Sequence, residues 1–145
     1  MNHPTTTITK TKLKANNKKL VAVLGPVDNL ESYVKADWWR HIFNANYLRT
    51  DGDVYCDETI TQTEVDVFEQ LLHLDKNASI LDLCCGQGRH VLEFARRGYS
   101  NLHGMDRSHY LVNRAKTQAR KEGLAITMKE GDARKLPYIN NMFDA

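Results

Sequence analysis

The fold of this chain is constrained most by one stretch, Ile80-Leu81-Asp82-Leu83-Cys84-Cys85-Gly86-Gln87-Gly88-Arg89-His90. It begins with an apolar run of strand length and passes through two glycines into a segment with helical spacing, which Gly98 ends. A strand that turns through Gly-x-Gly into the start of a helix lets a ligand approach the backbone, because a Cβ at the turn would occupy the ligand's space. The stretch therefore predicts a site for a nucleotide-like cofactor.

After this stretch, segments with strand and helix patterns alternate. Strands are predicted at about 102–105 and 125–129, and between them Ser108 should cap a helix that Gly123 ends. The buried side of that helix should carry Leu111, Val112, Ala115 and Ala119. We therefore expect an α/β fold, a three-layer Rossmann-like arrangement in which right-handed crossovers build a parallel sheet covered by helices on both faces.

Helices are also expected before the sheet. Thr61-Gln62-Thr63-Glu64 has the pattern of a capping box, so a helix should begin there, with Val65 and Phe68 toward the sheet. Residues 31–57 place aromatic side chains at three- and four-residue steps, and end in a turn at Asp51-Gly52-Asp53. They form either a helix packed on the main domain or a lid whose rings cover a ligand. We expect residues 58–145 to be the cofactor-binding part.

The charge of the chain is unevenly distributed. Residues 1–30 contain five lysines and one acidic residue, whereas the whole chain has a formal charge of +2. We interpret 1–30 as a flexible basic extension, and the nearly neutral remainder argues for a small-molecule partner over nucleic acid. No apolar run is long enough to span a membrane or to form a signal-peptide core. The cysteines, Cys56, Cys84 and Cys85, show no disulfide or metal pattern, which favours buried free thiols and a cytoplasmic location.

Each predicted strand leads into an acidic residue, in order Asp82, Asp106 and Asp132. The ends of parallel strands meet at one edge of a sheet, where ligands bind. Because the acids come one per strand, at strand spacings of about 5 Å and without a supporting His or second acid, we expect no metal site. Asp106 follows Gly86 by twenty residues, the spacing at which an acid reaches ribose hydroxyl groups in nucleotide-binding βαβ units.

These motifs resemble those of the class I S-adenosylmethionine-dependent methyltransferases, over about residues 61–145. The matching segments are Leu-Asp-Leu-Cys-Cys-Gly-Gln-Gly-Arg-His at 81–90, Gly-Met-Asp-Arg-Ser at 104–108 and Gly-Asp-Ala-Arg-Lys-Leu-Pro-Tyr at 131–138. The aromatic segment at 38–48 is similar to the helix that precedes the domain in small bacterial members. The resemblance implies methyl transfer with S-adenosyl-L-methionine as the cofactor.

The resemblance also implies a role for particular residues. Asp82 would help to hold the methionine ammonium, and Asp106 would accept hydrogen bonds from both ribose hydroxyl groups. The other implied cofactor residues are Cys85, Gly86 and Gly88 in the first motif, Arg107 after the ribose acid, and Asp132 and Ala133 beside the adenine. No catalytic residue is implied: His90 and His41 are candidates to touch a substrate, but neither has a visible partner in the sequence and a structural role is favoured for both.

Two features depart from the family pattern. Arg107 stands where members usually place an apolar residue against the adenine, so its guanidinium either stacks on the base or lies in solvent. The family's sheet has seven strands with the first and fourth as neighbours, and this sequence ends as the fourth opens at Phe143-Asp144-Ala145. We therefore expect a truncated chain that is inactive alone. The alternatives are an inactive cofactor-binding fragment and an NAD-type Rossmann domain, although Val91 replaces the third glycine of that fingerprint.

Overall fold

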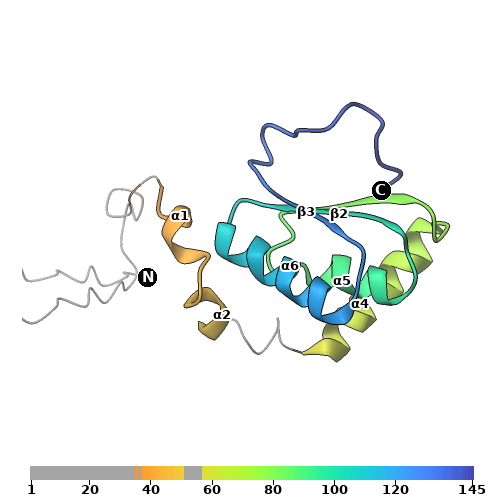
Figure 1. The fold of residues 1–145 in the computed structure, drawn as a ribbon, viewed down its shortest axis with the longest axis horizontal. Coiled ribbons are helices and arrows are strands. Elements are labelled where there is room, and N and C mark those ends of the chain that lie inside the picture. The colour runs from red at the N-terminus through yellow and green to blue at the C-terminus, as the bar shows by residue number, and fades with distance from the viewer. Residues whose placement is uncertain (1–34, 36, 51–56) are drawn as a thin grey trace, which may run out of the picture. The chain divides into compact units, whose positions relative to one another are not determined.

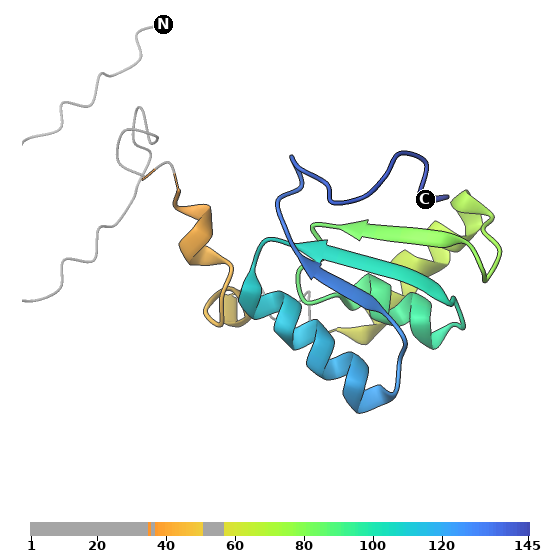
Figure 2. The ribbon, with the colours of Figure 1, turned by 45° about the horizontal axis from the view of Figure 1, so that its top comes forward.

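The computed structural model describes residues 35, 37–50 and 57–145. The expectations for the extension at 1–30, for the turn at 51–53 and for Cys56 lie outside these residues. Within them the sheet has three strands, β1 (Ser79–Leu83), β2 (Asn101–Asp106) and β3 (Thr127–Glu130), which are parallel and ordered β1-β2-β3 (Figure 2). Ile80 pairs with Leu102 and Gly104 pairs with Met128. The α/β class and the parallel sheet are confirmed.

Three helices cover the sheet on one face, α4 (Glu58–Leu72), α5 (Arg89–Arg96) and α6 (His109–Glu122) (Figure 1). The expectation of helices on both faces is therefore wrong for the described part of the chain. The cause is the strand order, because each new strand is added on the same side of the previous one. Right-handed crossovers that advance in a single direction place all of their helices on the same face.

The hydrophobic core lies between this face of the sheet and the helices. Ile80 and Leu102 contribute from the strands, Val91 and Phe94 from α5, and all four predicted residues of α6 are buried. The Ser108 side chain caps α6 by accepting a hydrogen bond from the Leu111 amide at 3.2 Å, as expected.

The capping box predicted for α4 is wrong. The helix begins earlier, at Glu58, because the Asp57 carboxylate accepts hydrogen bonds from the amides of Thr59 (2.8 Å) and Ile60 (3.4 Å). Thr61 is then a buried residue inside the helix, and its neighbour one turn on, Glu64, is directed at α5.

The aromatic segment forms two single helical turns, α1 (Trp39–Ile42) and α2 (Tyr47–Thr50), rather than one helix. Between them the Asn44 side chain accepts a hydrogen bond from the Asn46 amide at 2.8 Å, and such local bonds compete with helix continuation. The segment contacts the main domain at the start of α6, where Ser108 Oγ donates to the Phe43 carbonyl at 2.6 Å.

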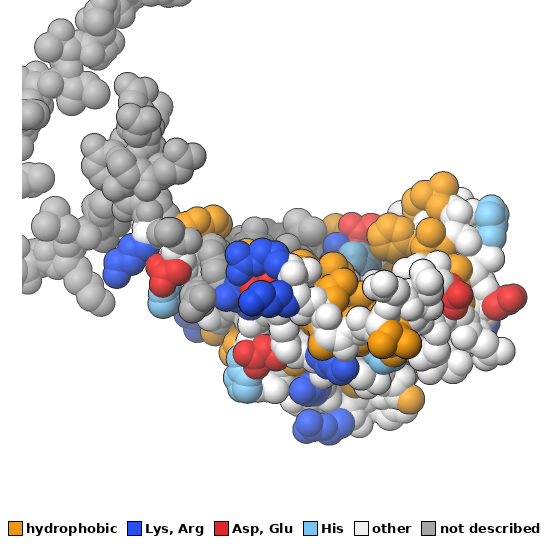
Figure 3. Space-filling model, turned by 90° about the horizontal axis from the view of Figure 1, so that it is seen from above, with side chains coloured by type: hydrophobic (Ala, Val, Ile, Leu, Met, Phe, Trp, Pro, Cys, Tyr) orange, Lys and Arg blue, Asp and Glu red, His pale blue; other side chains and the backbone are white. Residues whose placement is uncertain are grey.

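The opposite face of the sheet is crossed by the segment that follows β3 (Figure 1). Tyr138 and Phe143 pack their rings against His103 of β2, with centroids 5.7 and 5.1 Å from the imidazole. The end of this segment lies along the free edge of β1, where the Leu81 amide donates to the Ala145 carbonyl at 2.9 Å. Residues 144–145 therefore occupy the place beside β1 that the resemblance implies for a fourth strand. Figure 3 looks onto this face, where hydrophobic side chains gather. In the segment that follows β3, Leu136, Ile139 and Met142 are exposed.

Candidate functional site

The loop between β1 and α5 folds through three residues with positive φ, Cys84 (+62°), Gly86 (+56°) and Gly88 (+76°). The Cys85 amide donates to the Met105 carbonyl at 3.1 Å, which fixes the loop to β2. Cys84 is exposed, so the expectation that both cysteines are buried is wrong for it. Cys85 is buried, and burial raises the pKa of its thiol, so it acts as a small apolar group at the base of the loop.

The two glycines of the loop have different surroundings. At Gly86 an added Cβ would find only Leu111 Cδ1, at 3.9 Å, and the residue borders a cavity. At Gly88 an added Cβ would lie 3.0 Å from Ala115 Cβ and 3.2 Å from Val91 Cγ1. Gly86 thus leaves room on the side of the cavity, whereas Gly88 allows α6 to approach the loop. A ligand contact at Gly88 stays a prediction.

A cavity of about 630 Å³ opens at the carboxyl ends of the three strands. Its wall includes every predicted cofactor residue except Gly88: Asp82, Cys85, Gly86, Asp106, Arg107, Asp132 and Ala133. Phe43, Tyr47 and Leu48 add apolar side chains from the aromatic segment. The topology therefore brings into one cavity wall residues that are up to 51 positions apart in the sequence, from Asp82 to Ala133.

Asp82 is the most deeply placed acid of this cavity. Its Oδ2 atom is buried and has no hydrogen-bond partner within the described residues, and burial raises the pKa of the carboxyl group. A buried carboxylate of this kind is stabilised by a cationic donor. The ammonium group of an amino-acid ligand meets that requirement, so the residues present fit the amino-acid end of S-adenosylmethionine.

Asp106 is held in place by the backbone. Its Oδ2 accepts a hydrogen bond from the Gly86 amide at 2.9 Å, and its Oδ1 accepts from the Ser108 amide at 2.8 Å. Each carboxylate oxygen accepts about two hydrogen bonds, so both keep a lone pair for a diol. The Asp106 carboxylate is thus oriented in the cavity wall before any ligand is bound.

Asp132 is paired with two arginines. Arg134 Nη2 lies 2.6 Å from its Oδ2, and Arg107 Nη1 lies 3.2 Å from the same atom. The hydrogen bonds from Arg134 and the charge of Arg107 hold the pKa of this carboxyl well below its usual range. For Arg107 the sequence left stacking on the base or exposure to solvent; the structure adds an ion pair of its guanidinium with Asp132, and both alternatives stay predictions.

A cluster that the sequence did not predict lies on the other side of the loop. Glu64 Oε2 of α4 accepts a hydrogen bond from Arg89 Nη1 and lies 2.8 Å from His90 Nε2. His90 therefore has a partner that is not visible in the sequence, and so does His41, which lies 3.8 Å from Asp37 Oδ2. No sequence signal identified the Glu64 contacts, because they join residues 25 and 26 positions apart.

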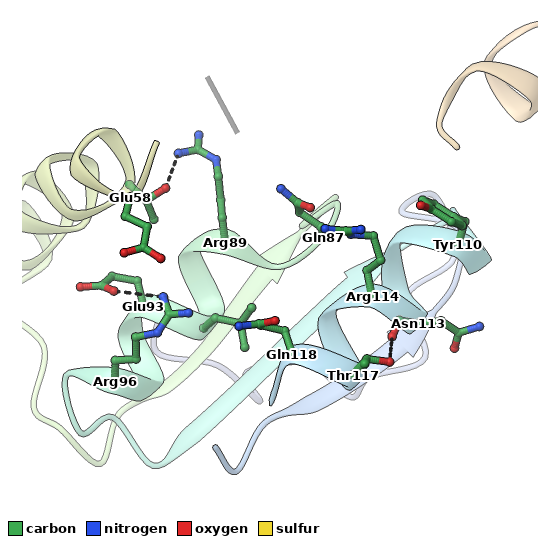
Figure 4. Close-up of a pocket in the computed structure, with 12 residues that line it drawn as sticks. Glu58, Gln87, Arg89, Glu93, Arg96, Tyr110, Asn113, Arg114, Thr117 and Gln118 are labelled. Carbon is green, nitrogen blue, oxygen red and sulfur yellow. Dashed lines mark hydrogen bonds and ion pairs between the residues drawn. The ribbon is translucent and has the colours of Figure 1, made fainter. Parts of the chain in front are cut away.

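A second cavity, of about 550 Å³, lies between α4, α5 and α6 (Figure 4). It shares Gln87 and Arg89 with the first cavity. Figure 4 shows the Arg89 side chain extending from the start of α5 toward α4, where Nη1 also lies 3.4 Å from Thr61 Oγ1. The wall of this second cavity also includes ion-paired side chains of the helices, such as Arg96 with Glu93.

The described ranges contain no group of three or more His, Cys, Asp and Glu side chains placed to hold a metal ion. None of the helices in the described part of the chain is long and apolar enough to cross a membrane. The arrangement is a polar and apolar cavity with one acid at the end of each strand, suited to a long ligand with several donors.

The chain is similar to known methyltransferases. Residues 80–145 match the family described as "Methyltransferase domain". The chain is 42% identical over 71 residues to a 2-phytyl-1,4-naphtoquinone methyltransferase of Nostoc punctiforme, which covers 45% of this chain and 30% of the relative. It is 31% identical over 77 residues to a demethylmenaquinone methyltransferase of Lactiplantibacillus plantarum, covering 50% and 32%. The chain thus spans less than a third of the length of these relatives.

Two solved structures share the fold. One, titled the [4+2]-cyclase SpnF, is 31% identical with a TM-score of 0.53, and the match covers 57% of this chain and 31% of that one. The other, titled an S-adenosylmethionine-dependent methyltransferase from Clostridium acetobutylicum, is 21% identical with a TM-score of 0.52, covering 74% and 40%. The second match supports the fold alone.

Proposed function

From the match of residues 80–145 to the methyltransferase domain family, we propose that the protein is a class I S-adenosylmethionine-dependent methyltransferase, which binds S-adenosyl-L-methionine in the cavity at the strand ends and methylates a small molecule. The observation that carries the proposal is the convergence of Asp82, Asp106 and Asp132 on one cavity. The unpartnered Oδ2 of Asp82 would receive the ammonium, the oriented Asp106 carboxylate the ribose hydroxyl groups, and Asp132 with Ala133 the adenine edge.

When bound, the cofactor would supply an activated methyl group on a sulfonium, which is displaced in line by the acceptor. The protein's own contribution is to hold the two reactants in line and to exclude water. Asp82 and Asp106 would fix the two ends of the donor, and the apolar side chains of Phe43, Tyr47 and Leu48 would cover the cavity. This assigns the aromatic segment as a lid, one of the two alternatives that the sequence left open.

We infer that the acceptor is small and largely apolar. Two of the relatives are named as methyltransferases of a naphthoquinone and of demethylmenaquinone, and the rings of Phe43 and Tyr47 offer an apolar wall. No residue is assigned as a general base. A base is needed only if the acceptor atom carries a proton that must leave, and the acceptor is identified here only by class.

Calorimetric titration with S-adenosylhomocysteine tests the binding proposal. We expect one site, and we expect Asp106→Ala to lose most of the affinity, because each hydrogen bond to a charged group contributes about 1.5–3 kcal/mol. Arg114→Ala is the control, since this exposed residue lies outside the strand-end cavity. Unchanged affinity of Asp106→Ala would remove that residue from the site, and preferential binding of NAD would overturn the proposal.

Methyl transfer needs a separate assay, because a structure titled as a cyclase shares this fold. The protein is incubated with labelled S-adenosylmethionine and a panel of quinols, phenols and amines, and labelled product is measured. Transfer to a quinol or phenol is the expected result for the whole protein, whereas these 145 residues alone, which span less than a third of the relatives' length, are expected to bind the cofactor without transferring label. Labelled product from these residues alone would contradict the expectation that they are inactive by themselves.

A further inference from the structure

The cluster formed by Glu64, Arg89 and His90 lies at the first turn of α5, immediately after the glycine loop. Arg89 and His90 both line the strand-end cavity, whereas Glu64 reaches them from α4 and lines neither cavity. The Arg89 and His90 side chains are mostly buried, with exposed fractions of 18% and 22%. Their positions are therefore set by the residues around them, and Glu64 is the residue that contacts both.

The cluster lies at a defined end of the cavity. β1 is at the edge of the described sheet and α5 follows it directly, so Arg89 and His90 are beside Asp82. Asp132 and Arg134 lie at the other end, after β3. His90 and Arg89 are also close enough to Asp82 for their charges to favour its ionised form. One end of the cavity thus has an acid, with an oxygen that has no hydrogen-bond partner among the described residues, next to two basic side chains.

An α-amino acid group carries an ammonium and a carboxylate on neighbouring atoms. Asp82 offers the negative charge for the first, and Arg89 with His90 offers the positive wall for the second. We propose that Glu64 is a positioning residue, which holds Arg89 and His90 in the wall of the cavity so that they receive the carboxylate of an amino-acid ligand. This rests on the proposed function, because it assumes that the cavity binds S-adenosylmethionine.

Glu64 holds the two side chains by one shared oxygen. Its Oε2 contacts Arg89 Nη1 and His90 Nε2, and the face of the imidazole is further fixed by the Phe68 ring of α4, with centroids 5.4 Å apart in an edge-to-face arrangement. These hydrogen bonds lower the pKa of the Glu64 carboxyl, with Arg89 as the larger cause. The carboxylate is therefore ionised at neutral pH and can orient both basic groups.

The test separates the two ends of the ligand. Binding of S-adenosylhomocysteine, which has the amino-acid group, is compared with binding of 5′-methylthioadenosine, which lacks it, in wild type and Glu64→Gln. We expect the substitution to lower the affinity for S-adenosylhomocysteine by roughly tenfold and to change the affinity for methylthioadenosine by no more than roughly twofold. A merely structural role would weaken both ligands alike.

Glu69→Gln is the matched control. Glu69 lies on the same helix and also contacts two basic side chains, Lys76 and Arg97, each at 2.7 Å, but it borders neither cavity. It should leave the affinity for both ligands unchanged. Arg89→Gln is a second variant in case Glu64→Gln does not fold, and it should show the same difference between ligands.

The outcomes distinguish the two proposals. Equal weakening of both ligands by Glu64→Gln and Arg89→Gln, or no weakening by either, would overturn the positioning role and leave the cofactor site intact. If wild type binds neither ligand, the proposed function itself fails and the positioning role fails with it.

Discussion

At the scale of single residues, Asp82 lowers the stability of the ligand-free protein but is suited to binding a ligand. Its buried Oδ2 has no partner in the described residues, so the ligand-free protein carries an unfavourable buried polar atom. A residue that costs stability and lines a cavity is typical of a binding site. Replacement by asparagine keeps the shape and removes the charge, so the two effects should separate.

We predict that Asp82→Asn raises the free energy of unfolding of the ligand-free protein at pH 7 by about 1 kcal/mol and lowers its affinity for S-adenosylhomocysteine by roughly tenfold. The sign follows from the raised pKa of Asp82. The folded state favours the protonated carboxyl, so wild-type stability falls as the pH rises above the ordinary value of 3.8, and asparagine has no such loss. The difference should be present at pH 7 and close toward pH 3. Thermal unfolding at both pH values and calorimetry measure it; lower stability of the variant at pH 7 would contradict the argument.

Gly88 provides a second prediction at this scale. Gly88→Ala should destabilise the protein by about 1–3 kcal/mol, because alanine is strained at φ +76° and its Cβ would lie 3.0 Å from that of Ala115. Gly123→Ala is the control: it has a similar φ of +68° with no atom within 4 Å of an added Cβ. Urea unfolding of the two variants separates backbone strain from packing, and equal losses would show that packing against α6 contributes nothing.

At the scale of elements, Arg97, which directly follows α5, joins the end of that helix to α4. This guanidinium donates to the Asp66 carboxylate at 2.6 Å, to Glu69 at 2.7 Å and to the Gln62 carbonyl at 2.9 Å, while also contacting Glu93 of its own helix at 2.9 Å. Aromatic contacts add to the junction, since the rings of Phe68 and Phe94 stack with centroids 6.5 Å apart. The helix is thus held by a charge network over an apolar contact.

We predict that Glu69→Gln lowers the free energy of unfolding by about 1 kcal/mol at pH 7. The hydrogen bond from Lys76 is the largest cause that lowers the pKa of Glu69 to about 2, and Arg97 adds to it. A lowered carboxyl pKa contributes stability above the unfolded value of 4.5, and this is lost as the pH falls toward 2. Urea unfolding at pH 7 and pH 3 should therefore show the difference between variant and wild type shrinking in acid. A constant difference would assign the effect to packing.

The elements also show what a sequence can predict. Ser108 and Gly123 bound α6 as expected, because both signals act on the backbone within a few residues. The start of α4 was placed too late because Asp57 and Thr61 are both competent caps, and the choice depends on Glu64 being drawn to Arg89 instead of back to its own helix. Contacts between distant side chains decide such cases, and their pattern is not local.

At the scale of the whole molecule, the positions of the acids were predictable and their partners were not. Alternating strands and helices dictate that Asp82, Asp106 and Asp132 meet at one edge of the sheet. The pairing of Arg107 with Asp132 depends on how two loops pack, which no periodicity encodes. The single layer of helices results from the strand order β1-β2-β3, and the sequence motifs did not determine that order.

If the cavity binds its ligand only in the folded state, ligand and stability are linked. S-adenosylhomocysteine at one hundred times its dissociation constant should raise the free energy of unfolding by about 2.7 kcal/mol. Thermal unfolding across a ligand series measures this, with NAD as the control nucleotide. A shift that is equal for NAD would contradict a site selective for the sulfur-containing nucleoside.

The attachment of α4 to α5 has a consequence for how such proteins are divided into parts. The family match begins at residue 80, yet the side chains that fix the first turn and the last turn of α5 come from Glu58–Leu72. The segment that matches the family and the segment that packs together in the fold therefore begin at different residues. Anyone who transplants, swaps or recombines this domain at residue 80 would leave behind the helix whose side chains contact α5 directly after the glycine loop.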